Sequence, residues 1–169
     1  MNRRVILNLS MVTALGFIIL PGMAWAQQKT LKEQVIGTWA YSSDENVAAD
    51  GTKRQLFGPG SRGLLVLSAN GQYSQIISRA DVPRFKSNNR LEGTPEENRA
   101  AVQGTTAAFG TWSINETDHT LVVRIEGGLF PNQSGSDSIR TVSVFGDELR
   151  YVSKVGGGGT STTIFVRAK

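Results

Sequence analysis

Two carboxylates and an arginine lie close together in the sequence, around a segment rich in glycine and apolar residues. Glu126 opens the Glu-Gly-Gly-Leu-Phe-Pro-Asn segment, and Asp137 and Arg140 follow it. Two carboxylates at a suitable separation can act as general acid and general base. Three interpretations of this group therefore stay open: a structural network, a ligand site, or an acid–base site with Glu126 and Asp137 as the catalytic candidates.

A second set of residues could contact a small molecule through aromatic faces and a few polar groups, which is how ligand pockets obtain specificity. Phe130 lies in an apolar loop, so we expect its ring to turn inward. Arg79 opens a long loop, where it either pairs locally with Asp81 or forms a rim that meets an anionic head group. The ligand-binding candidates are Tyr41, Tyr73, Gln75, Arg79, Phe130, Arg140 and Tyr151.

The composition removes several kinds of site. The chain has no cysteine, which excludes disulfides, thiolate metal sites and a cysteine nucleophile. Its one histidine, His119, excludes a multi-histidine metal cage and is expected in a solvated turn. The glycines at 156–159 lack the Lys-Ser/Thr of a phosphate-binding loop, so we interpret them as a hairpin tip. We expect no metal and no cofactor.

Residues 1–26 have the pattern of a secretory signal peptide. Two arginines near the start precede an uncharged apolar run, and Ala24-Trp25-Ala26 supplies a small-x-small cleavage pattern. The apolar run is shorter than the ~20 residues that a transmembrane helix needs. We therefore expect an exported protein, periplasmic or secreted, that has no stable membrane anchor after cleavage and keeps residues 27–169 as its single domain.

The charge of the chain gives no reason to expect a nucleic-acid partner. The formal net charge is +4, and loss of residues 1–26 removes two arginines and no acid, which leaves about +2. Basic residues alternate with acidic ones, and the longest basic run in the mature chain is the pair Lys53-Arg54. A surface that follows a phosphate backbone needs concentrated positive charge. We therefore exclude nucleic acid as a partner.

Short apolar segments separated by glycine-rich turns dominate the mature sequence. Asn70-Gly71 between two such segments indicates a tight hairpin, in which both turn positions adopt positive φ. Regular short strands of this kind predict a meander closed as a barrel or sandwich. The expected strands cover residues 37–42, 63–68, 72–78, 109–114, 120–126, 138–145, 148–154 and 160–167, and residues 31–36 suggest one short helical turn.

One segment has helical signals instead. Thr94 can cap a helix, Pro95 suits the first helical position, and Glu97 completes a capping box. These residues predict a short helix around residues 95–106. The preceding stretch, residues 79–93, reads as a long loop that is either solvated or acts as a lid.

Several motifs, in order along the chain, resemble the bacterial and fungal lipocalin-like domain family. Gly37-Thr38-Trp39 is similar to the Gly-x-Trp signature of lipocalins and their relatives. The similarity continues through Arg62-Gly63-Leu64-Leu65, Asn70-Gly71-Gln72-Tyr73, Gly93-Thr94-Pro95-Glu96-Glu97, Phe109-Gly110-Thr111-Trp112 and the Glu126 to Asn132 segment, and it covers roughly residues 35–167. It implies an all-β fold, an antiparallel up-and-down lipocalin-like (calycin) β-barrel with an interior cavity and one inserted helix.

Gly37, Trp39 and Arg167 form the expected structural signature of this barrel. Trp39 is expected to plug the closed end rather than contact a ligand. The first and last strands become neighbours when a barrel closes, so we expect Arg167 to stack on the Trp39 ring as a cation–π pair.

Three functions from different classes remain open. The first is an exported protein that carries or sequesters a small, mostly hydrophobic molecule in the barrel interior. The second is a small isomerase- or cyclase-type enzyme on the same scaffold, which would need an inward-facing acid or base. The third is a structural or partner-binding cell-envelope protein, which would expose an apolar patch on the helix or on the loop around Phe130. The sequence leaves the oligomeric state open.

Overall fold

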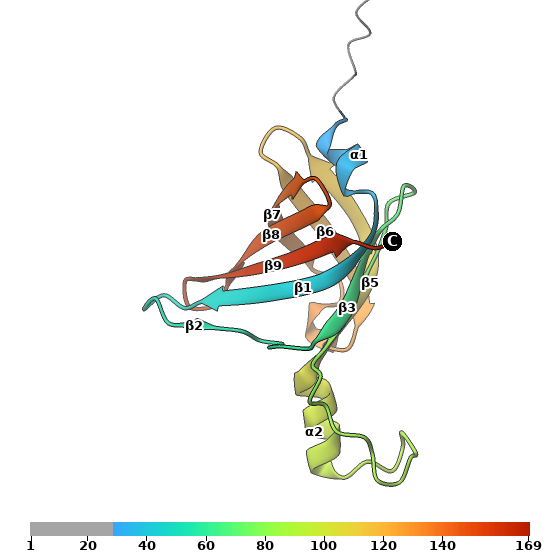
Figure 1. Cartoon of the computed structure of the whole chain (residues 1–169). Coiled ribbons are helices and arrows are strands. Elements are labelled where there is room, and N and C mark those ends of the chain that lie inside the picture. Colours follow the sequence, from blue (N-terminus) through green and yellow to red (C-terminus); the bar gives the residue numbers. More distant parts are fainter. Residues whose placement is uncertain (1–28) are drawn as a thin grey trace, which may run out of the picture.

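Eight antiparallel strands close into a barrel through hydrogen bonds between β1 and β9 (Figure 1). The computed structural model describes residues 29–169, so the predicted signal segment lies outside the described residues. The barrel strands are β1 (Gly37–Val47), β3 (Arg62–Leu67), β4 (Gln72–Ser78), β5 (Thr105–Asn115), β6 (Thr120–Gly128), β7 (Asp137–Phe145), β8 (Glu148–Val155) and β9 (Gly159–Arg167). This confirms the predicted all-β barrel and the place of each of its strands.

A β-bulge in β1 decides which of its side chains enter the barrel. The pairing with β9 runs from Trp39 opposite Arg167 to Val47 opposite Thr160, and its register shifts between Tyr41 and Ser43. An extra residue in one strand reverses the alternation of its side chains beyond that point. Trp39 and Tyr41 therefore pack against the core before the bulge, and Asp44 is buried after it.

The far half of β1 has a second partner that the sequence pattern did not predict. The two-residue strand β2 (Lys53–Arg54) pairs with Asn46 and Val47, so a hairpin extends beyond the end of β3. The β8–β9 hairpin extends to the same side, because β9 stays paired with β1 as far as Val47. Figure 1 shows the two hairpin tips next to each other.

A short helix closes the opposite end. Helix α1 (Leu31–Val35) begins at a Thr30 capping box, and its Leu31 and Val35 side chains are buried in the core. The Glu116 carboxylate, from the β5–β6 turn, accepts hydrogen bonds from the first two helical N–H groups, both at 2.9 Å. The single predicted helical turn at residues 31–36 is thereby confirmed.

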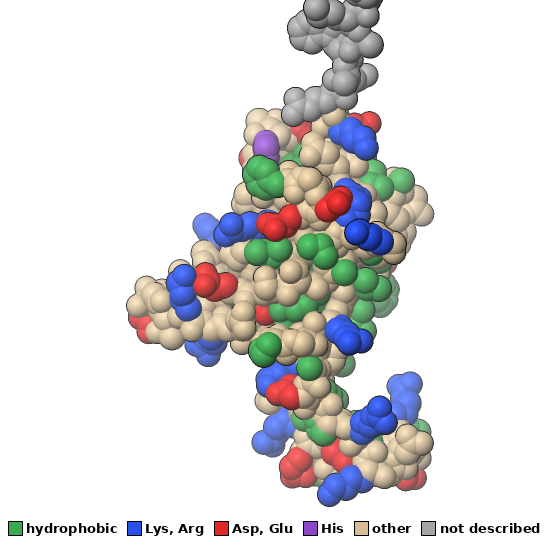
Figure 2. All heavy atoms as spheres, viewed as in Figure 1, with side chains coloured by type: hydrophobic (Ala, Val, Ile, Leu, Met, Phe, Trp, Pro, Cys, Tyr) green, Lys and Arg blue, Asp and Glu red, His purple; other side chains and the backbone are tan. Residues whose placement is uncertain are grey.

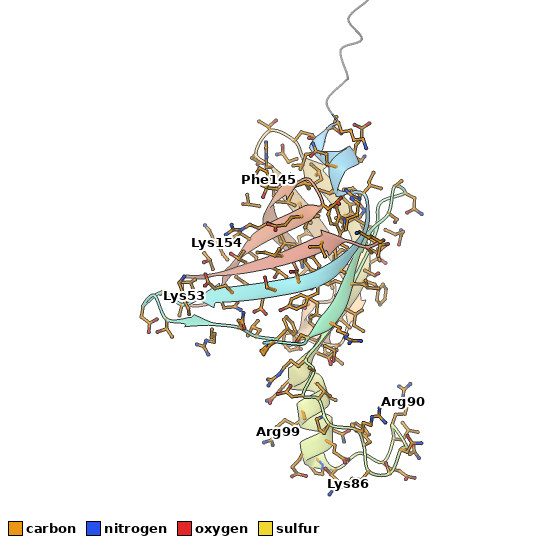
Figure 3. All side chains as sticks on the ribbon, in the orientation of Figure 1. Lys53, Lys86, Arg90, Arg99, Phe145 and Lys154 are labelled. Carbon is orange, nitrogen blue, oxygen red and sulfur yellow. The ribbon has the colours of Figure 1, made fainter. Side chains whose placement is uncertain are left out.

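The predicted inserted helix is present but two residues shorter than expected. Helix α2 (Pro95–Gly104) has the predicted capping box, and β5 begins directly after it at Thr105. With the loop before it, α2 projects beyond the barrel, and Lys86, Arg90 and Arg99 point into solvent around it (Figures 1 and 3). The segment does not cover the barrel, so the lid interpretation of the loop is wrong. No helix within residues 29–169 combines the length and the apolar character that crossing a membrane requires.

The Asn70-Gly71 hairpin forms where it was predicted, with a different turn. Gly71 has a φ of 85°, whereas Asn70 is not among the residues with positive φ. The N–H of Gly71 donates to the Ser68 carbonyl, and the N–H of Ser68 donates to the Gln72 carbonyl. The loop is thus longer than a two-residue turn, and only its last position requires glycine.

Candidate ligand site inside the barrel

Four of the predicted ligand-binding residues meet inside the barrel. Tyr73 and Gln75 lie two residues apart on β4 and therefore share its inner face. Arg140 on β7 and Tyr151 on β8 reach the same region from the other wall, and both are buried. The Tyr151 hydroxyl donates to Gln75 Oε1 at 2.7 Å, and the Tyr73 hydroxyl is 3.3 Å from the same oxygen.

Arg140 is the positive centre of this cluster, and the residue is only 8% exposed. Its Nε donates to Ser138 Oγ at 3.2 Å, and both terminal nitrogens reach the Tyr73 hydroxyl at 3.4 Å. Its Cζ lies 4.6 Å from the centroid of the Tyr151 ring. Within residues 29–169, no Asp or Glu oxygen lies within the 4.0 Å of an ion pair with this guanidinium.

The tyrosines of the cluster act as hydrogen-bond donors. Burial raises the pKa of the Tyr151 phenol, although the nearby Arg140 charge partly opposes this. A neutral phenol keeps its proton and can donate it, as Tyr151 does to Gln75. The region thus combines one cation and two phenol donors with few acceptor atoms.

A second polar cluster surrounds the buried carboxylate of Asp44, which pairs in register with Thr163 of β9, as Tyr151 does from β8. Its two oxygens accept hydrogen bonds from the Tyr41 hydroxyl at 2.6 Å, from Asn46 Nδ2 at 3.1 Å, and from the backbone N–H groups of Leu56 and Phe57 at 2.7 and 3.3 Å. Burial and the bond to Asp44 raise the pKa of the Tyr41 phenol, which therefore stays protonated. Through the N–H groups of Leu56 and Phe57, Asp44 thus holds the segment after β2 against β1.

A pocket of about 540 Å³ opens beside this second cluster, between the two projecting hairpins. Its lining includes Asn46 and Val47, which lie on opposite faces of β1, together with the tips of both hairpins, so the pocket lies at the end of the barrel from which the hairpins project. Its walls are largely apolar and include Ala48, Leu56 and Val155, with Arg54 as a charged member. A larger pocket of about 670 Å³ lies at the α1 end among charged side chains such as Glu33 and Asp147.

The signature residues meet at the closed end. Trp39 is fully buried and donates its indole N–H to the Val35 carbonyl at 2.8 Å. The Arg167 Cζ lies 4.1 Å from the centroid of the Trp39 ring, which is the contact expected from the sequence. Arg167 also donates to the carbonyl oxygens of Ile36 at 3.2 Å and Gln34 at 2.9 Å. Gly37 has a φ of 140°, and a Cβ there would press on the Arg167 guanidinium.

The family model of the lipocalin-like domain matches residues 36–168, a range that includes every strand of the barrel. The chain belongs to the lipocalin-like domain family. None of the curated proteins compared with this chain matches it.

Solved barrel structures resemble this lipocalin-like domain at low identity. A lipocalin-like protein from Bacteroides uniformis is 15% identical, with 80% of this chain and 99% of that chain covered and a TM-score of 0.42. A redesigned beta barrel, mFAP1 bound to DFHBI, is 12% identical, with 82% and 100% covered and a TM-score of 0.40. A variant of the fluorescent protein UnaG is 16% identical, with 81% and 98% covered and a TM-score of 0.38.

Two predicted ligand-binding residues of the lipocalin-like domain lie apart from the interior cluster. Arg79 follows β4 and pairs with Asp81, the local alternative that the sequence left open. Phe130 is 58% exposed, so the expectation that its ring turns inward is wrong. The loop after β6 is held by its own backbone: Leu129 donates to the Ala107 carbonyl at 2.8 Å and Gly135 to the Ile125 carbonyl at 2.8 Å. These bonds fix the turn outside the barrel.

The two catalytic candidates also lie outside the barrel. Glu126 is exposed on β6, and Asp137 is exposed at the start of β7, where it pairs with Arg124 at 3.2 Å. Asp137 and Arg140 are three positions apart, so they lie on opposite faces of β7. The proposed network of Glu126, Asp137 and Arg140 is therefore wrong.

Several interior residues were missed from the sequence. Asp44, Asn46 and Thr163 are buried in the barrel, and Ser138 contacts Arg140. Asp44 and Asn46 follow the β1 bulge. Without the bulge, simple alternation from Trp39 would predict that both side chains point outward. Ser138 could have been found, since it lies two residues from Arg140 and shares its face.

Proposed function

We propose that this protein is an exported carrier or scavenger that binds a small, mostly hydrophobic molecule in the interior of its barrel. One observation carries the proposal: a largely apolar pocket opens between the two projecting hairpins, and its lining residue Asn46 is bonded to the buried Asp44, which also binds Tyr41. Ligand sites of this kind combine apolar walls with a few well-placed polar groups. Asn46 and the two polar clusters provide those groups here.

The interior supports binding better than catalysis. Glu126 and Asp137, the candidate acid and base, both point away from the barrel. Asp44 is buried, but four donors already engage its two oxygens. A general base needs a lone pair directed at the substrate, and the carboxylates of the described residues offer none inside the barrel.

The export part of the proposal rests on residues 1–26. Cell fractionation and N-terminal sequencing of the natural product test it. We expect the mature chain to begin at Gln27 and to be found outside the cytoplasm. A cytoplasmic protein that retains Met1 would contradict export and leave the binding proposal in place.

A titration with N-phenyl-1-naphthylamine, a neutral hydrophobic probe whose fluorescence rises in apolar surroundings, tests the binding proposal. We expect saturable binding of about one probe per chain. Ala48→Trp should fill the pocket and weaken binding by at least about tenfold. Ala69→Trp adds the same bulk on the exposed β3–β4 turn and serves as the matched control. Absence of saturable binding, or equal weakening by both variants, would contradict the proposal.

A partner-binding role is the second candidate, because the outer wall carries a row of apolar side chains. Strand register places them side by side across five strands, at Val166, Ala40, Leu64, Ile76 and Ala107. Leu64 and Ile76 are 43% and 51% exposed, and hydrophobic side chains gather on the side of the barrel where β3 lies (Figure 2). Exposed apolar patches often mark contact sites.

Sedimentation velocity over a range of concentrations tests this second candidate. If the row is a contact surface between copies, the sedimentation coefficient should rise with concentration, and the double variant Leu64→Ser/Ile76→Ser should abolish the rise. A monomer at every concentration that also captures no envelope protein would remove the candidate.

A further inference from the structure

We infer that the ligand carries a carboxylate, and that Arg140 binds this group deep inside the barrel. The inference rests on the proposed function, since it assumes that the interior receives a small molecule. It goes beyond that function, because a purely hydrophobic ligand would require no charged side chain in the barrel.

The first argument is the charge of Arg140. A buried ion needs a partner, since desolvation of an isolated charge is costly. Arg140 is 8% exposed, and within the described chain no carboxylate oxygen reaches it. Asp44 is the other buried charge of the barrel. Its oxygens accept hydrogen bonds from Tyr41, Asn46 and two backbone N–H groups. The interior therefore holds a cation that the protein itself does not neutralise.

The second argument is the balance of donors and acceptors around Arg140. A guanidinium carries five N–H donors and no acceptor. Both phenolic hydroxyls of the cluster are directed at the single acceptor oxygen of Gln75. Arg140 is left with the Ser138 hydroxyl and the Tyr73 oxygen. A carboxylate would bring two acceptor oxygens into a region where donors are in excess.

The third argument is the shape of the contact between Arg140 and Tyr73. The two terminal nitrogens share one hydroxyl oxygen, each at 3.4 Å, which is long for a hydrogen bond. A carboxylate binds the same two nitrogens with two separate, shorter bonds of about 2.7–2.9 Å. Tyr73 has a second partner in Gln75, so its hydroxyl can leave Arg140 without losing every bond. Arg140 thus has a bidentate position that a ligand can take.

The surroundings fix the orientation of such a ligand. The Tyr151 ring lies against the face of the guanidinium, which leaves its edge to form hydrogen bonds. The apolar pocket at the open end would take the hydrocarbon part, beside Leu56 and Val155. The ligand class is therefore an amphiphile whose carboxylate enters first and whose apolar tail stays near the opening.

Calorimetric titration with decanoate and with decanol tests the inference, because the two probes share a ten-carbon chain and differ in charge. We expect decanoate to bind at least about tenfold more tightly than decanol. Arg140→Leu should abolish that preference while decanol still binds. Arg150→Leu removes an exposed arginine from the outer face of β8 and is the matched control, which should keep the preference.

A second measurement needs no variant, so it holds even if Arg140→Leu does not fold. The carboxyl carbon of ¹³C-labelled decanoate reports its ionisation by NMR. Bound beside Arg140, it should stay ionised at pH values at which free decanoate takes up a proton, since an adjacent cation lowers a carboxyl pKa.

The outcomes separate the inference from the proposed function. Equal affinity for decanoate and decanol, or a bound carboxyl that titrates like the free one, would overturn the inference and leave a neutral-ligand function standing. If decanoate, decanol and N-phenyl-1-naphthylamine all fail to bind, the proposed function fails with it.

Discussion

Arg167 joins the last strand to the start of the barrel through three contacts made by one side chain. Its guanidinium stacks on the Trp39 ring and donates to the carbonyl oxygens of Gln34 and Ile36. Both carbonyls lie where the chain leaves α1 and enters β1. Arg167 also forms an ion pair with Asp147 at 3.7 Å, but the Asp147 side chain is exposed, so the bonds to backbone and the Trp39 contact contribute most of the stabilisation.

Replacement of Arg167 by alanine should lower the free energy of unfolding by about 2 kcal/mol, because a cation–π contact and charged hydrogen bonds are lost together. Urea denaturation followed by tryptophan emission measures this loss. The control is Arg124→Ala, which breaks an exposed ion pair with Asp137 and should cost less than about 1 kcal/mol. Equal losses of unfolding free energy in the two variants would show that the Arg167 contacts stabilise the fold no more than an exposed ion pair does.

At the residue scale, sequence reasoning located part of the interior and missed the rest for identifiable reasons. Tyr73, Gln75 and Tyr151 lie on clearly alternating strands, so they could be predicted to share a region. Phe130 could not be placed, because backbone bonds of a loop, not its apolar character, decide where its ring points. The inward direction of Asp44 could not be predicted, because it follows a β-bulge and no residue type predicts that bulge.

Among the elements, the strands were the most predictable part of the fold, because each carries its own alternating pattern. The ends of the strands were less predictable. Strand β1 runs to Val47 and β5 begins at Thr105, and both ends lie beyond the predicted segments. These extensions depend on partners, since Val47 pairs with Lys53 and Thr160, and Thr105 pairs with Ser78. A pattern within one segment does not contain that information.

Helix α2 depends on the charge of one residue. Glu97 accepts hydrogen bonds from the backbone N–H of Thr94 at 2.9 Å and of Lys86 at 3.0 Å. These bonds lower the pKa of Glu97 below its ordinary value of 4.5. A lowered carboxyl pKa stabilises the folded form fully above that ordinary value, and the contribution is lost as the pH falls through the lowered pKa.

We therefore expect the amide signals of Thr94 and Lys86 to titrate together in NMR spectra, with a midpoint below 4.5, and the helical shifts of α2 to weaken over the same range. Glu97→Gln should remove this titration and release one of the two amides, because glutamine offers a single acceptor oxygen. Glu96→Gln, at an exposed position of the same turn, should leave it intact. Titration at or above the ordinary value would contradict the capping role.

For the whole molecule, closure of the barrel takes the place of disulfides. The chain has no cysteine, and β9 gives a hydrogen-bonded neighbour to both β1 and β8. Edge strands left open tend to pair with other chains. Strand β9 therefore covers the edges of β1 and β8. It also places Phe165 and Thr163 in buried positions.

Deletion of residues 159–169 should yield aggregated protein instead of a smaller barrel, because it exposes the edges of β1 and β8 and removes Phe165 from the core. Size-exclusion chromatography of the soluble fraction measures the outcome. Deletion of Lys169 alone should leave a soluble protein with unchanged elution. A soluble monomer after the longer deletion would show that β1 and β8 can close or shield themselves.

The placement of the aromatic side chains has a spectroscopic consequence. The tryptophans of the described chain, Trp39 and Trp112, have indole N–H groups bonded to the carbonyl oxygens of Val35 and Ser68. All three tyrosines of the chain contribute to the barrel interior, Tyr73 and Tyr151 beside Arg140. Light absorbed by the tyrosines can pass by resonance energy transfer to the two indoles. A colourless molecule that moves Tyr73 would alter this transfer, so the protein could signal occupancy of its interior without a dye.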